Sequence, residues 1–198
     1  MSSKSLEETL KPQGHLEIIK TYLDGTKEVV FSDHNVITVG LGVTLATLFG
    51  NLTPGTSIEK YQIKYFQLGT AGSVSYSTSA LTKLDTQFTQ SDYGGTSLGL
   101  RSHYNTDGSG GTTTQTFAEL GAEAITKVST DQVTYIIDLD TDTGNGKSVT
   151  EIGLFASDPL DLETSVATKG SLLCAYRYFP AISKTTTFAL TFKWTITF

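Results

Sequence analysis

The 198-residue sequence has little of the residue types that proteins use for covalent or metal-based stability. Its single cysteine, Cys174, excludes a disulfide within the chain and a zinc site built from several cysteines. Cys174 lies in an apolar, strand-like run, which predicts a small buried side chain and an unreactive thiol. No apolar run has the length of a membrane-spanning helix, and residues 1–14 lack the apolar segment of a signal peptide. We therefore expect synthesis in the cytoplasm and no membrane partner.

Charged residues are also scarce, at 17% of the chain, and they are mostly acidic, which gives a formal net charge of −6. An acidic chain without a basic face disfavours binding to nucleic acid. Threonine, serine and glycine take the place of the missing charges. Threonine fits half-exposed strands, and glycine and serine fit turns, so the composition favours many strands joined by loops.

The clearest pattern in the sequence is an alternation through residues 187–198. Successive side chains on a strand point to opposite faces, so this alternation predicts a strand with one buried face and one exposed face. A helix would scatter the same residues around its surface. The expected buried face consists of large apolar side chains at every even position: Phe188, Leu190, Phe192, Trp194, Ile196 and Phe198.

Other segments show strand or turn patterns that complete an all-β fold. Residues 15–23 and 27–32 flank Asp24-Gly25, a strong hairpin signal. An amphipathic pattern predicts one short helix over residues 36–49. No strand–helix–strand repeat is present, which disfavours a parallel sheet. We predict an antiparallel β-sandwich, jelly-roll-like, of about eight strands, with the remaining strands at residues 61–68, 133–139, 149–155 and 172–179.

The domain prediction is an N-terminal arm, residues 1–14, followed by one β-sandwich domain, residues 15–198. The arm is either a frayed terminus or a segment that lies on a neighbouring subunit, with Leu6 and Leu10 as its apolar contacts. Within the domain, residues 69–121 are rich in glycine, serine and threonine and predict a long loop region. So long a loop is unusual unless it contacts something, and we expect Tyr93 and Tyr104 to form part of a partner interface there.

Gly95-Thr96-Ser97-Leu98-Gly99 matches the nucleophile elbow of serine hydrolases. That elbow requires a buried strand before the serine, a helix after it, and an acid and then a histidine further along. The preceding residues do not resemble a buried strand. His103 is the only later histidine, and no acid lies between it and Ser97. The pattern therefore favours an ordinary loop over a hydrolase site.

Asp138, Asp140 and Asp142 alternate before Gly144 in a way that resembles a calcium-binding loop. The glycine and glutamate that an EF-hand needs at its sixth and twelfth positions are absent. Aspartate also suits a hairpin turn, so both a loose metal site and a purely structural turn stay open. The histidines lack metal-ligand spacing. We expect no catalytic group, no resident metal and no cofactor: the protein is predicted not to be an enzyme.

Two stretches resemble tail-fibre (tail-collar) proteins of tailed bacteriophages. The run TEIGLF at residues 150–155 is similar to a strand of that family, and the corner FPAISKT at residues 179–185 followed by the alternating strand falls in the same order. The opening run from Gly14 also looks like the start of small phage virion proteins. In the family these motif residues are core and corner positions, so no functional residue carries over.

The resemblance implies a structural protein of a phage virion, assembling at the tail, neck or fibre-attachment apparatus. The expected partners are other virion proteins and copies of the same chain, with a homotrimer favoured because threefold symmetry is common in such apparatus. Two alternatives stay open: a decoration protein on the capsid surface, and a module that binds glycans of the host surface through exposed aromatic residues between Tyr93 and Tyr104.

Overall fold

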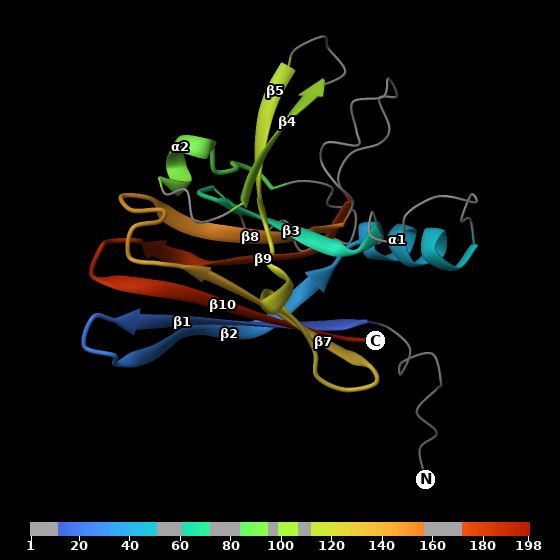
Figure 1. Cartoon of the computed structure of the whole chain (residues 1–198), viewed down its shortest axis with the longest axis horizontal. Coiled ribbons are helices and arrows are strands. Elements are labelled where there is room, and N and C mark those ends of the chain that lie inside the picture. The colour runs from blue at the N-terminus through green and yellow to red at the C-terminus, as the bar shows by residue number, and fades with distance from the viewer. Residues whose placement is uncertain (1–11, 51–60, 72–83, 95–98, 107–111, 157–171) are drawn as a thin grey trace.

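The structure is a computed structural model that describes residues 12–50, 61–71, 84–94, 99–106, 112–156 and 172–198 (Figure 1). These residues form ten strands, two α-helices and one 3-10 turn. The strands are β1 (Gln13–Tyr22), β2 (Lys27–Ile37), β3 (Ile63–Gly69), β4 (Gly99–Thr106), β5 (Thr112–Glu119), β6 (Ile125–Lys127), β7 (Gln132–Leu139), β8 (Ser148–Ala156), β9 (Leu172–Ser183) and β10 (Phe188–Thr197). The helical elements are α1 (Val39–Gly50), α2 (Gln90–Tyr93) and the 3-10 turn η3 (Ala122–Ala124).

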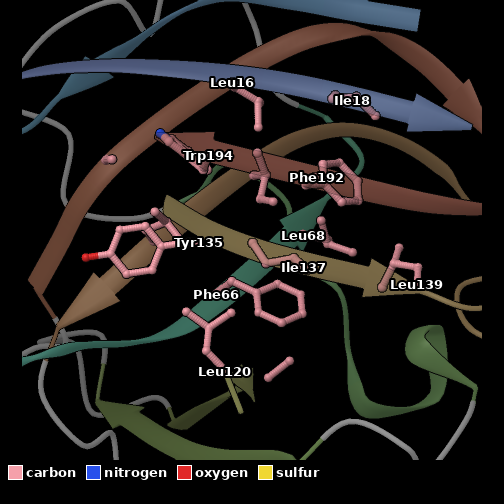
Figure 2. Close-up of a cluster of buried hydrophobic side chains, with 14 of the residues drawn as sticks. Leu16, Ile18, Phe66, Leu68, Leu120, Tyr135, Ile137, Leu139, Phe192 and Trp194 are labelled. Carbon is pink, nitrogen blue, oxygen red and sulfur yellow. The ribbon is translucent and has the colours of Figure 1, made fainter. Parts of the chain in front are cut away.

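All ten strands belong to one antiparallel sheet in the order β4-β5-β3-β8-β9-β2-β1-β10-β7-β6. The sheet changes direction at β2, which pairs with β1 along most of its length and then with β9 through Val36 and Ile37. The sheet curls into a half-barrel, so that β3 in one half faces β7 in the other across the core (Figure 2). The predicted all-β, antiparallel fold with one short helix is confirmed. The two layers, however, are halves of one curled sheet, with more strands than the eight expected.

The core between the two halves contains the buried face of β10. Side chains along β10 alternate between buried and less buried positions, and Trp194 is completely buried. Leu16 and Ile18 of β1 lie beside it, and Phe66 of β3 faces it from the opposite half (Figure 2). The predicted burial of the even positions is therefore confirmed through Ile196. Phe198 follows the end of β10 and is 40% exposed.

The first hairpin forms where Asp24-Gly25 predicts it. Gly25 adopts a φ of 86°, a left-handed conformation that glycine tolerates without steric cost. The strand after this turn continues to Ile37, so α1 begins at Val39, later than the predicted helix. The helix lies against β9, and Gly40 permits this approach, since a Cβ atom there would be 2.1 Å from the carbonyl oxygen of Leu173.

Residues 69–121 contain regular structure that the sequence analysis treated as a loop. β4 and β5 form a hairpin paired from Gly99 with Glu119 to Thr106 with Thr112. Only the base of this hairpin joins the rest of the sheet, because β3 pairs with β5 at Glu119 and Ala118 alone. The outer part projects from the body of the molecule (Figure 1). The loop prediction for this stretch was wrong, because the polar residues of β4 and the threonines of β5 form strands on either side of the glycine-rich residues 107–111.

Candidate functional site

The four residues predicted to form a partner interface fall in different environments. Leu6 and Leu10 lie outside the described residues. Tyr104 lies on the projecting strand β4, where its backbone pairs with Thr114. Tyr93 ends α2 and is completely buried.

Tyr93 is a core residue, and its assignment to an interface was wrong. Its hydroxyl oxygen accepts a hydrogen bond from the backbone N–H of Leu68 at 3.1 Å. Its ring packs edge-on against Phe66 and Phe88, with centroids 6.5 and 5.2 Å away. Burial raises the pKa of the Tyr93 phenol, which therefore stays neutral. The sequence places this tyrosine among glycines and serines, and only the tertiary packing of α2 shows that it points inward.

The structure does not supply the surroundings that a nucleophile elbow at Ser97 requires. Residues 95–98 lie outside the described residues, but their neighbours are α2 before them and β4 after them. An elbow needs a strand first and a helix second. The order of the two flanking elements is reversed here.

Asp138 lies near the end of β7, and Asp140 and Asp142 lie in the turn that follows; Asp138 and Asp140 have structural partners. One Asp140 oxygen, Oδ1, accepts hydrogen bonds from the backbone N–H of Asp142 at 3.0 Å and from the hydroxyl of Thr143 at 2.7 Å. The Asp138 carboxylate accepts a hydrogen bond from the Thr191 hydroxyl on β10 at 2.5 Å. Among the described residues, no three His, Cys, Asp or Glu side chains come together as a metal site would require.

Lys184, from the corner that follows β9, lies beside the same turn. Its Nζ donates to Asn145 Oδ1 at 3.1 Å and to the Thr185 carbonyl at 2.9 Å, and it lies 5.5 Å from the centre of the Phe188 ring. Burial lowers the pKa of Lys184, while the charges of Asp140 and Asp142 act in the opposite direction. The corner lysine thus provides a cation at the acidic turn.

Glu151, in the TEIGLF run, is a completely buried acid on β8. Its carboxylate accepts hydrogen bonds from the backbone N–H groups of Asp85 and Thr86, at 3.2 and 3.0 Å, and from the hydroxyl of Tyr176 at 3.1 Å. Burial raises the pKa of Glu151, and these hydrogen bonds oppose that shift. Gly69 leaves room for the carboxylate, since a Cβ there would be 2.3 Å from Oε1. Through these hydrogen bonds, Glu151 holds Asp85 and Thr86, which precede α2, against the sheet.

A concave feature lies beside β7, near the end of the sheet formed by β6. A cavity of about 600 Å³ opens between β7 and the segment that joins β5 to β6. Its lining combines apolar side chains, small residues and three carboxylates: Phe66, Glu119, Leu120, Gly121, Ala122, Glu123, Ala124, Ile136, Ile137 and Asp138. Sequence reasoning missed this cavity, because its walls come from segments far apart in the chain. The only signal was the acidic residues near residue 121.

Comparisons of the chain with protein-family models, with curated proteins and with solved structures found no match in any of the three. None of the helices in the described residues has the length and apolarity needed to cross a lipid bilayer.

Proposed function

We propose that this chain is a non-enzymatic structural protein of a tailed-phage virion, located at the tail, neck or fibre-attachment apparatus. The observation that carries the proposal is the β4–β5 hairpin, which is anchored to the sheet only at its base and projects from the body of the molecule (Figure 1). Such a projection offers a neighbouring subunit a contact away from the core. The sequence resemblance to tail-fibre proteins is a second support, because its motif residues make structural contacts in this chain.

The two motif stretches support the proposal through what their polar residues do. Glu151 of TEIGLF and Lys184, which follows the β9 part of FPAISKT, are each less than 2% exposed, and each makes hydrogen bonds to a segment outside the strands. These contacts stabilise the loops against the sheet, as expected for a scaffold on which other proteins assemble. The proposed partners are copies of this chain, with a trimer favoured, and other virion proteins.

The experiment that tests the proposal is quantitative mass spectrometry of purified particles, combined with imaging of the labelled protein. A few copies at one vertex or along the tail support the assignment to the attachment apparatus. Many copies that follow the capsid lattice assign the protein to capsid decoration instead. Absence from every particle overturns the virion proposal. The glycan-binding alternative loses one of its two named aromatics, because Tyr93 is buried.

A further inference from the structure

The cavity beside β7 has the features of a site for an extended peptide segment. Its floor is apolar: Phe66 and Ile137 approach each other from opposite halves of the sheet, and Leu120 lies next to them (Figure 2). Ile136 adds an apolar rim and is 36% exposed. The volume of about 600 Å³ is ample for a large aliphatic side chain together with its neighbours.

One wall of the cavity is a strand edge whose backbone groups can be assigned from two hydrogen bonds. The N–H of Val128 donates to the carbonyl of Gln132 at 2.9 Å, and the N–H of Phe198 donates to the carbonyl of Asp131 at 2.8 Å. Backbone groups alternate in direction along an antiparallel strand. Even-numbered residues of β7 therefore direct their N–H and C=O groups away from β10, towards the side of β6.

β6 covers only the first part of that edge. Its last pair with β7 joins Ile125 to Tyr135, and within the described part of the chain no strand continues the pairing further along β7. The backbone N–H and C=O of Asp138 therefore face the cavity side without a partner strand. An unpaired edge of this kind can accept an added strand through main-chain hydrogen bonds.

The charge of the cavity lining favours a positively charged segment over a negatively charged one. Among the described residues of the lining, the ionisable ones are Glu119, Glu123 and Asp138, and none is basic. Glu123 is exposed on η3. Lys193 on β10 lies between Ile136 of β7 on one side and the acidic Glu17 of β1 on the other. A cation beside the cavity would therefore be attracted to Glu123 and Asp138, and the net charge of −6 disfavours a second acidic copy as the occupant.

We propose that this cavity binds an extended segment of a partner protein that carries an aliphatic side chain flanked by lysine or arginine. The segment adds a strand to β7 at Asp138, its aliphatic side chain packs against Ile136 at the apolar rim, and its cations contact Glu123 and Asp138. The partner chemistry rests on the proposed assembly role, yet peptide binding is measured on the isolated protein. A negative peptide result would therefore not decide whether the protein belongs to a particle. Absence from particles would not decide whether the cavity binds the peptide.

The test is NMR titration of the full, isotope-labelled chain with two peptides, TKLKT and its charge-reversed form TELET. We expect TKLKT to shift the amide signals of Glu123, Ile136 and Asp138 and to slow hydrogen exchange at Asp138, whereas TELET causes no such changes. Glu123→Lys should weaken binding at least about tenfold, since it replaces an attraction with a repulsion. Glu28→Lys makes the same charge change on exposed β2, away from the cavity, and should leave the affinity unchanged.

Three results would overturn the proposal. One is equal binding of the two peptides, and another is that TKLKT shifts signals only outside the cavity or none at all. The third is a concentration-dependent shift of Ile136 and Asp138 without peptide, which would assign the edge to a second copy of the chain.

Discussion

The carboxyl group of Glu151 and the amine of Lys184 are both buried, and each stabilises a loop that would otherwise have few contacts with the sheet. A buried polar group costs free energy unless it is hydrogen-bonded, so both must keep their partners. The pKa values of the two groups shift in opposite directions. Burial raises the pKa of Glu151 and lowers that of Lys184, so each charged state is disfavoured by the fold and retained through local contacts.

Glu151→Gln should remove a pH dependence from the stability of the protein. The folded-state pKa of Glu151 is raised above its ordinary value of 4.5. The stability linked to its proton is therefore fully present below the unfolded-state pKa and is lost as the pH rises through the folded-state pKa. Urea denaturation at acidic and neutral pH measures this. Wild type should lose stability relative to Glu151→Gln as the pH rises, and a constant difference would contradict the argument. Glu28→Gln on exposed β2 is the matched control.

Glu151→Gln also changes the hydrogen bonding of the segment before α2. The new amide group would face the backbone N–H of Asp85 or of Thr86, leaving a donor unsatisfied, at a cost of about 1–3 kcal/mol. Faster hydrogen exchange at these two amides, relative to the amides of β1, is the expected result. Unchanged protection there would show that the segment is held by other contacts.

Trp194→Ala should destabilise the fold by about 3–5 kcal/mol, because truncation of a large core side chain leaves a cavity. Trp194 is completely buried, and its indole N–H has no hydrogen-bond partner in the described part of the chain. Trp194→Phe should therefore cost less, because it retains an aromatic ring and removes the unsatisfied donor. Denaturant titration gives both values. Phe198→Ala, at a 40% exposed position, is the control, and equal melting temperatures for all variants would show that the core lies elsewhere.

Among the elements, the strands with clean alternation could be predicted and the projecting hairpin could not. β10 and the β1–β2 hairpin show patterns that short-range physics determines, namely one buried face and a glycine turn. β4 and β5 are built mainly from threonine and other polar residues. Large apolar residues do not alternate with polar ones in their sequences, so the sequences carry no strand signal. The inward position of Tyr93 was missed for a related reason, since it depends on where α2 packs.

Shortening the β4–β5 hairpin should separate assembly from folding. Replacing residues 103–115 with Asn-Gly keeps the base, including Phe117 and Ala118, and closes the hairpin with a two-residue turn. The melting temperature should stay within a few degrees of wild type, because changes away from the core usually contribute within about 0.5 kcal/mol. Incorporation into particles should fall sharply. Normal incorporation of the shortened protein would remove the hairpin from the proposed interface.

At the scale of the whole molecule, the half-barrel determines where open edges and cavities lie. The sheet begins at β4 and ends at the three-residue strand β6, and the cavity lies close to that second edge. The sequence could predict an antiparallel all-β fold, but not this arrangement. The cavity depends on the register of β6 against β7 and on the curl of the sheet, which long-range packing determines.

Deletion of residues 1–11 should leave the sheet folded, because β1 begins at Gln13. Circular dichroism and the melting temperature should match those of the full chain. The sequence prediction assigns Leu6 and Leu10 to contacts with a neighbouring subunit, so the deletion should lower the oligomeric mass or the incorporation into particles. The double substitution Leu6→Ser and Leu10→Ser retains the chain length and should have the same effect. Assembly indistinguishable from that of wild type would show that the arm makes no contact with a neighbouring subunit.

The pairing of Gln13 with Thr197 has a mechanical consequence. β1 and β10 are antiparallel neighbours inside the sheet, so the two ends of the described chain leave the same end of these strands, side by side (Figure 1). A tensile force applied between these two ends would open the β1–β10 hydrogen bonds one after another, as a zipper opens. It would not shear them all at once. A protein with this geometry resists stretching poorly when held by both ends and is better suited to carry force through its faces.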